Sequence, residues 1–133
     1  MSKDWVQDMS VMHSKFAVNE VVRNMDKEKL KAFLQFRIDF LQEELDEMKE
    51  AVTADDAVDA LIDLCVIAIG TLDAFDCDAY EAWDRVWNAN MDKEVGIKTE
   101  RPNPLGLPDL VKPTGWTSPT HKDLAGMLDK VYD

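Results

Sequence analysis

Residues 26–52, DKEKLKAFLQFRIDFLQEELDEMKEAV, contain a stripe of apolar side chains that decides the fold. The stripe consists of Leu30, Leu34, Leu41, Leu45, Met48 and Val52. Because its members are separated by three, four or seven positions, they share one face of an α-helix about seven turns long. Asp26 favours a helix start, since its carboxylate can accept hydrogen bonds from the first free backbone N–H groups. A helix of this length is typical of a helical bundle.

Three further helical segments are expected, at residues 4–16, 54–75 and 79–92. Thr53 is a suitable N-cap for the second of them. The middle of that segment, residues 60–72, is almost entirely apolar, so we expect most of it to be buried on several sides. The chain offers no convincing strand pair. The predicted fold class is therefore all-α, a bundle of about four main helices.

The C-terminal part of the chain has a different character. All five prolines lie in residues 101–119, which excludes a continuous helix and a regular central strand. The same stretch carries apolar residues that a free linker would not need: Leu105, Leu107, Leu110, Val111 and Trp116. We expect residues 94–119 to form an irregular strap over the bundle or a neighbouring subunit, and residues 121–132 a short closing helix. Residues 1–133 are predicted to be one all-α domain.

The composition excludes several classes of partner. The chain has 15 Lys and Arg against 27 Asp and Glu, a net charge of −12. It therefore has no excess of cations for nucleic acid or for an anionic membrane surface, and neither partner is expected. The first residues lack the apolar core of a signal peptide, and the longest apolar run, residues 64–70, is too short to span a bilayer. The two cysteines form no disulfide framework, and a cytoplasmic protein is expected.

Asp63 lies where water should be absent, inside the run ALIDLCVI of residues 60–67. An unpaired buried carboxylate costs several kcal/mol, so a cation or hydrogen-bond donors are expected beside it. Asp59 lies one turn earlier on the same helix face, and Asp56 another turn back.

The matching acidic residues on the first long helix are Glu43, Glu44 and Glu47. At about 100° per residue, Glu44 and Glu47 flank the apolar stripe on either side of Phe40, and Glu43 lies further round, suited to a supporting or solvent-facing role. If the two helices pack antiparallel, their carboxylates form an all-oxygen cage, which suits Mg²⁺, with Mn²⁺ as a substitute. The simpler alternative is that this acidic run forms a solvated helix face.

Other metals fit the sequence less well. It has no Cys/His cluster for zinc, and His13 and His121 lack the Glu-x-x-His placement of a di-iron bundle. Both histidines are expected at the surface. Phe33, Phe36 and Phe40 are expected in the core.

The acidic segments EELDE at 43–47 and DALIDL at 59–64 resemble the motif of the MazG-like all-α nucleoside triphosphate pyrophosphohydrolases. Phosphoribosyl-ATP pyrophosphohydrolase and the dimeric dUTPases are related to this group. Its pattern is Glu-x-x-Glu, a spacer, then Glu-x-x-Asp. Glu44 and Glu47 match the first half, but Ala60 stands where the second half has glutamate. Asp59, with Asp56 as the alternative, would supply that carboxylate.

Further segments resemble the phosphoribosyl-ATP pyrophosphohydrolase branch in the same order along the chain. These are the Met-His-x-x-Phe helix at 12–16, the Gly-Thr pair at 70–71, NANMDK at 88–93 and LVKPTGWTSP at 110–119. The resemblance implies four metal ligands: Glu44, Glu47, Asp59 and Asp63. It implies that Glu44, Glu47 and Asp63 are also catalytic. It also implies three kinds of substrate contact. The cations Arg85, Lys93 and Lys112 would bind phosphate, and the amides of Asn88 and Asn90 would bind sugar or phosphate. The ring of Trp116 would stack on the base.

The resemblance implies a magnesium-dependent hydrolase that converts a nucleoside triphosphate to the monophosphate and diphosphate and so controls nucleotide pools. Deoxynucleotides are favoured, and purines are among the candidate bases. A base-selective member, such as a dGTP diphosphohydrolase or a dUTPase, is one alternative, and a non-catalytic acidic helical adaptor is another. The short chain also resembles virus-encoded members, which would act in a host cytoplasm. Relatives commonly associate through these helices, so a homodimer or homotetramer is expected.

Overall fold

The computed structural model describes residues 1–98, 100, 105–106 and 109–132. The chain forms two compact units. The first consists of Met1–Ala79 together with Asp123–Asp133, and the second consists of Tyr80–Lys122. Within the described residues, no helix combines the length and the apolarity needed to cross a membrane.

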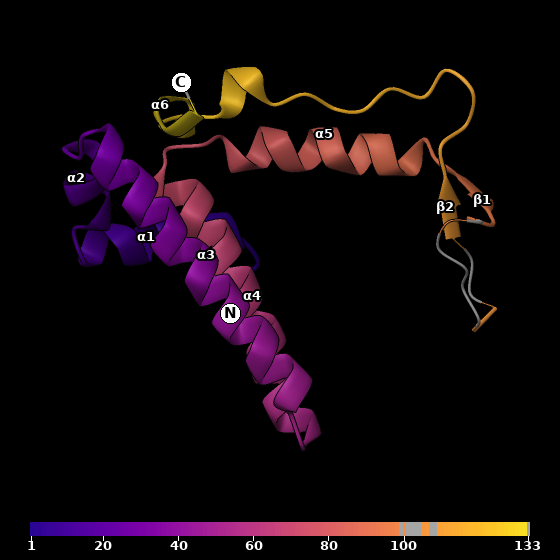
Figure 1. The fold of residues 1–133 in the computed structure, drawn as a ribbon, viewed down its shortest axis with the longest axis horizontal. Helices are drawn as coiled ribbons and strands as arrows, with labels where there is room; N and C mark the ends of the chain where they lie inside the picture. The colour runs from indigo at the N-terminus through magenta and orange to yellow at the C-terminus, as the bar shows by residue number, and fades with distance from the viewer. Residues whose placement is uncertain (99, 101–104, 107–108, 133) are drawn as a thin grey trace. The chain divides into compact units, whose positions relative to one another are not determined.

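The first unit is built on a helical hairpin, α3 (Lys27–Glu50) and α4 (Ala54–Ala74), whose helices run side by side (Figure 1). Both expected caps are confirmed. Asp26 Oδ1 accepts the Lys29 N–H at 2.9 Å, and Thr53 Oγ1 accepts the Asp56 N–H at 3.1 Å. The predicted helices therefore form with bounds within two residues of those expected.

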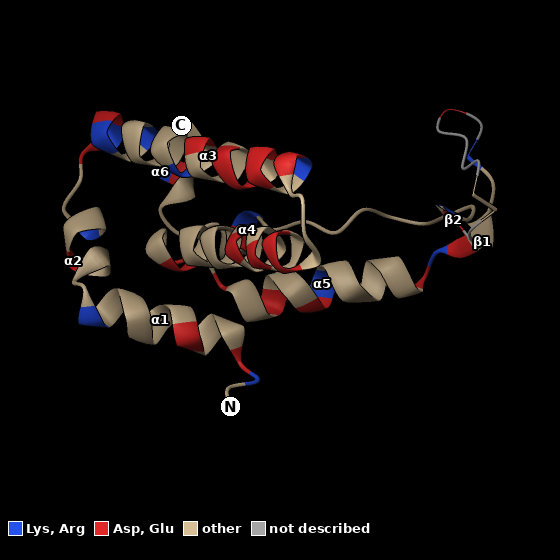
Figure 2. Cartoon of the chain, turned by 90° about the horizontal axis from the view of Figure 1, so that it is seen from below, with Lys and Arg blue, Asp and Glu red and all other residues tan. Residues whose placement is uncertain are grey.

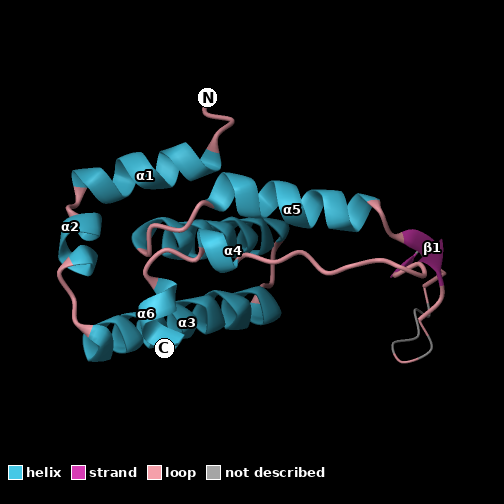
Figure 3. Ribbon diagram, turned by 90° about the horizontal axis from the view of Figure 1, so that it is seen from above, coloured by secondary structure: helices cyan, strands magenta, loops and turns pink. Residues whose placement is uncertain are grey.

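Helices α1 (Trp5–Lys15) and α2 (Val18–Arg23) precede the hairpin and both pack against α4 (Figure 3). The helix expected at residues 4–16 is confirmed as α1. The chain turns at Ala17, whose φ of 58° lies in the left-handed region, and α2 follows at once. Six residues are too few to show a helical period, which is why the sequence did not indicate α2.

The core of this unit lies at the end of the hairpin away from its connecting turn. Its buried residues are Val22, Leu30, Ala74, Phe75 and Val131. Phe33 packs beside them with its ring centroid 5.5 Å from that of Phe75. Helix α6 (Leu128–Tyr132) contributes Val131 and packs against α3.

The single closing helix expected at residues 121–132 is wrong. A 3₁₀ turn, η1 (Lys122–Leu124), is separated from α6 by Gly126. Gly126 has a φ of 54°, and an added Cβ would lie 2.6 Å from the Asp76 carbonyl oxygen, so this position requires glycine. The following Met127 N–H donates to the Phe75 carbonyl at 2.7 Å.

The second unit contains α5 (Ala79–Met91), which the sequence predicted, and an antiparallel pair, β1 (Glu94–Gly96) and β2 (Asp109–Val111). The expectation of no strand pair is corrected by this short ladder, in which Val95 faces Leu110. Three-residue strands are too short for a clear alternating pattern. The strap is tied down by Trp116, whose Nε1 donates to the Ala89 carbonyl at 2.7 Å. Leu107, also expected in the strap, lies outside the described residues.

Several apolar side chains of the hairpin stay exposed in the single chain. Leu61 and Ile62 are 48% and 46% exposed, although residues 60–72 were expected to be buried on several sides. Phe36, expected in the core, is 54% exposed. The hairpin thus has more apolar surface than these short helices cover.

Candidate functional site

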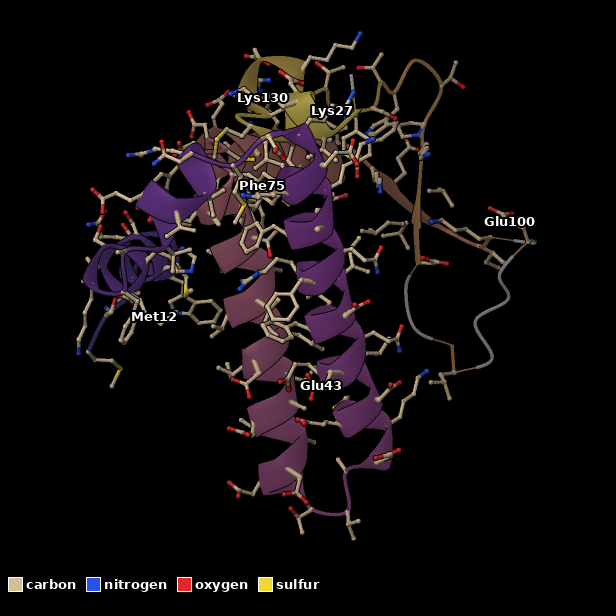
Figure 4. The ribbon with its side chains drawn as sticks, turned by 60° about the vertical axis from the view of Figure 1, so that its left-hand side comes forward. Met12, Lys27, Glu43, Phe75, Glu100 and Lys130 are labelled. Carbon is tan, nitrogen blue, oxygen red and sulfur yellow. The ribbon has the colours of Figure 1, made fainter. Side chains whose placement is uncertain are left out.

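The acidic residues of the hairpin gather toward its connecting turn, at the C-terminal half of α3 and the N-terminal half of α4 (Figure 2). There a cavity of about 350 Å³ is lined by Glu43 and Glu44 from α3 and by Asp63 from α4. Figure 4 labels Glu43 in this part of the hairpin and Phe75 in the core at the other end. The two helices therefore bring together carboxylates about twenty positions apart in the sequence.

Glu44 is the most perturbed of these carboxylates. Its Oε2 atom is buried and has no hydrogen-bond partner among the described residues. Burial, a hydrogen bond with Glu47 and the charges of Glu47, Asp63 and Glu43 together raise the pKa of Glu44 to about 7. An ionised Glu44 is therefore repelled by its neighbours and lacks a compensating donor, which is the electrostatic setting of a cation site.

The other two predicted metal ligands, Glu47 and Asp59, do not line this cavity. Glu47 is exposed on α3 and acts on Glu44 through its charge, while Asp59 is exposed on α4 and does not line the cavity. In the part of the chain that the structure describes, no three Asp, Glu, His or Cys side chains converge closely enough to hold an ion as they stand. The carboxylates would have to move together for that, and mutual repulsion in the absence of a cation opposes this.

The same cavity holds one cation, Arg37, which the sequence analysis missed. Its guanidinium is half-buried, and burial lowers its pKa. Arg37 lies at a helical spacing between Leu34 and Leu41, inside the apolar stripe that defines α3. A cation in an otherwise apolar stripe was the signal that could have revealed it.

The rest of the cavity wall is apolar. It consists of Met9, Met12, Phe40, Val66 and Ile67. Phe40 therefore borders the site, although the sequence assigned it to the core. A cavity whose described lining has an acidic end, an apolar wall and the cation Arg37 has the chemistry of a site for a small amphipathic molecule.

In the second unit, the predicted substrate contacts cluster around Trp116. The Nζ atoms of Lys93 and Lys112 lie 5.3 Å and 5.1 Å from the centroid of its ring. Asn88 and Asn90 are exposed near the C-terminal end of α5. Their assignment as substrate contacts stays a prediction.

Arg85 lies elsewhere on α5. It donates from Nε to Glu81 Oε1 at 3.1 Å and from Nη1 to the Thr120 carbonyl at 2.9 Å. Its guanidinium holds Thr120, the residue after the strap, to the helix, so a phosphate contact would have to use its remaining donors.

The family model of phosphoribosyl-ATP pyrophosphohydrolase matches residues 13–90, more than half of the chain. The chain belongs to the phosphoribosyl-ATP pyrophosphohydrolase family. No curated protein and no solved structure matches it. Membership supports a pyrophosphohydrolase that acts on a nucleotide phosphoanhydride. The matched span contains all the candidate carboxylates and Arg37, and it ends before Lys93.

The pair of His13 and Asp73 contradicts the expectation that His13 lies at the surface. His13, expected at the surface, is 3% exposed, and its Nδ1 lies 2.8 Å from Asp73 Oδ2. Asn19 also donates to Asp73 Oδ2, at 3.3 Å. This pair ties α1 to the C-terminal end of α4, which holds one wall of the carboxylate cavity in place. His121 is partly buried, and its Nδ1 has no hydrogen-bond partner within the described ranges.

Proposed function

We propose that this phosphoribosyl-ATP pyrophosphohydrolase family member is a metal-dependent nucleoside triphosphate pyrophosphohydrolase. It would convert a nucleoside triphosphate and water to the monophosphate and diphosphate. The observation that carries the proposal is the buried, unpartnered Oε2 of Glu44, in a cavity shared with Asp63 and lined on its other wall by apolar side chains.

The donor set fits Mg²⁺ or Mn²⁺. Glu44 and Glu47 from α3 and Asp63 from α4 would hold the ion, with Asp59 supplying a further carboxylate. All four offer oxygen, which these hard cations prefer. When bound, such an ion would offset the charge of the substrate phosphates and lower the pKa of a coordinated water.

The chain itself would position the substrate. Water attack at the α-phosphorus requires that the leaving diphosphate be held, and Lys93 and Lys112 are the proposed contacts for its oxygens. Both ammonium groups lie over the ring of Trp116. Asn88 and Asn90 are proposed contacts to sugar or phosphate, and Arg85 is a further candidate for phosphate.

We also propose that the protein works as a homodimer or homotetramer. The support is the exposed apolar surface of the hairpin, formed by Phe36, Val58, Leu61 and Ile62. A second copy of the chain would cover this surface by helix packing.

The experiment that tests the proposed function is a diphosphate-release screen with Mg²⁺ or Mn²⁺. Its substrates are the eight common nucleoside triphosphates, dUTP and phosphoribosyl-ATP, because the family takes its name from the last. We expect turnover of at least one triphosphate. A base-selective enzyme, such as a dGTP diphosphohydrolase or a dUTPase, would show turnover of one substrate. Turnover of phosphoribosyl-ATP alone, or of no substrate, would contradict the proposal.

A non-catalytic adaptor is distinguished by calorimetry. Titration of Mg²⁺ with a non-hydrolysable triphosphate should give saturable binding heat for an enzyme. The adaptor would give none.

A further inference from the structure

Arg37 is a cation for which the described part of the chain supplies no acidic partner. Its Nε donates to Thr71 Oγ1 at 2.9 Å, and its Nη2 donates to the Ile67 carbonyl at 3.0 Å. Across the described residues, no carboxylate lies within ion-pair distance of it. A half-buried guanidinium satisfied only by neutral oxygens, in a chain with 27 acidic residues, is available for a ligand.

The guanidinium is held in one orientation by α4. Gly70 is buried, and a Cβ added there would lie 2.8 Å from Arg37 Nη2. The absence of a side chain at Gly70 therefore lets the guanidinium lie against the helix, where Thr71 and the Ile67 carbonyl bind it. Thr71 is itself fixed, because its hydroxyl donates to the same Ile67 carbonyl at 2.7 Å. A rigidly held fork of donors is the arrangement that gives specific recognition.

Arg37 and the carboxylates stand at opposite ends of one cavity. Arg37, Phe40 and Glu44 are spaced three and four positions apart on α3, so they share a face. At 1.5 Å per residue, Arg37 and Glu44 are about 10 Å apart along the helix axis. Phe40 lies between them, with its ring centroid 6.0 Å from Arg37 Cζ. A nucleotide whose phosphates lie at the carboxylate end would extend its base along Phe40 toward Arg37.

The donors left on Arg37 define what it can bind. A guanidinium has five N–H groups, and two of them are used by Thr71 and Ile67. The three that remain are on Nη1 and Nη2, a fork that pairs with two adjacent acceptors. Among the common bases, guanine offers such a pair at O6 and N7, and cytosine at O2 and N3. Adenine, thymine and uracil have no two free acceptors side by side.

We propose, building on the function above, that Arg37 binds the base of the substrate and selects one with two adjacent hydrogen-bond acceptors. Guanine and cytosine share this chemistry. The proposal makes Arg37 a specificity-determining residue, with Gly70 and Thr71 as its positioning residues.

The test compares kcat/KM for dGTP, dCTP, dATP and dTTP. We expect wild-type protein to favour dGTP or dCTP over dATP and dTTP by about tenfold to a hundredfold, the usual discrimination of a bidentate pair. If dGTP is favoured, 7-deaza-dGTP, which has C–H in place of N7, should lose most of that preference. If dCTP is favoured, 3-deaza-dCTP should lose it.

Substitutions test whether Arg37 is the residue that selects the base. Arg37→Lys lacks the fork and should bring the four kcat/KM values within about threefold of one another. Thr71→Val removes the acceptor for Nε and should weaken the preference in part. Arg23→Lys is the matched control, because Arg23 is 59% exposed, pairs with Asp76 and does not line the cavity.

The possible outcomes separate this inference from the function on which it builds. An equal loss for all four bases in Arg37→Lys would identify a phosphate contact and overturn the inference, as would deaza analogues that behave like their parents. If no triphosphate is hydrolysed, the proposed function fails, and calorimetric binding of dGMP, dCMP, dAMP and dTMP still decides the role of Arg37. The deaza comparison uses wild-type protein, so it holds even if Arg37→Lys does not fold.

Discussion

Glu44 and Asp63 extend from neighbouring antiparallel helices into one cavity, and the negative charge of Asp63 contributes to the raised pKa of Glu44. The hairpin of α3 and α4 therefore places Glu44 where the charge of Asp63 disfavours its ionisation. Folding with this repulsion is unfavourable in the absence of a cation, and a bound divalent ion would relieve it.

The first prediction concerns pH. The pKa of Glu44 rises from an ordinary value of 4.5 to about 7 in the folded chain. Between those values the folded state binds more protons than the unfolded state, so the free energy of unfolding should fall as pH rises from about 4.5 to 7. Urea unfolding at pH 5 and pH 8 in EDTA measures this fall. Glu44→Gln should reduce it, whereas Glu28→Gln, an exposed control on the first turn of α3, should leave it unchanged.

The second prediction concerns the acidic run of α3. Glu44→Gln and Glu47→Gln should each lower kcat at least about a hundredfold, because loss of a metal ligand displaces the activated water. Glu43→Gln should cost less, although Glu43 also lines the cavity. Steady-state diphosphate release measures all three. A larger effect at Glu43 than at Glu44 would mean that the ligands are assigned to the wrong residues.

The third prediction concerns the carboxylate that replaces the family glutamate at Ala60. Asp59→Asn should lower activity more than Asp56→Asn, because Asp59 is one turn from Asp63 on the same face. Both aspartates are exposed, so neither change should alter the melting temperature much. The Mg²⁺ concentration for half-maximal activity is the sensitive measurement. The reverse order of effects would assign the role to Asp56.

The fourth prediction concerns assembly. Leu61 and Ile62 are each about half exposed, so a dimer or tetramer should form and Leu61→Glu should dissociate it. Multi-angle light scattering at micromolar concentration measures the mass. Lys122→Glu, an exposed change in η1, is the control. A fully active 15.1 kDa monomer would exclude an obligate oligomer.

Regular helix signals allowed much of the fold to be predicted. Asp26 and Thr53 mark the starts of α3 and α4. Such caps can be predicted because the side chain accepts a hydrogen bond from a backbone N–H in the first turn of the same helix. The break at Gly126 was not predictable, because it depends on carbonyls of residues 75 and 76, far away in the sequence. Neighbours distant in sequence also explain the buried His13, whose partner Asp73 belongs to another helix.

The carboxylates of the site could also be predicted from local sequence patterns. The spacing of Glu44 and Glu47 and the apolar surroundings of Asp63 indicate carboxylates on facing helices without any tertiary information. The sequence shows Arg37 inside the apolar stripe, but its binding to Thr71 and the space left by Gly70 exist only after the hairpin closes.

The central claim is that Asp63 belongs to a catalytic metal site, and the most direct test is diphosphate release by Asp63→Asn with saturating Mg²⁺. Asp39→Asn is the control, because Asp39 is exposed on α3 and does not line the cavity. The account predicts that Asp63→Asn retains the helical circular dichroism spectrum and an equal or higher melting temperature in EDTA, since a charge repulsion is removed, while its kcat falls below about 1% of wild type. Near-wild-type activity of a folded Asp63→Asn protein would contradict it.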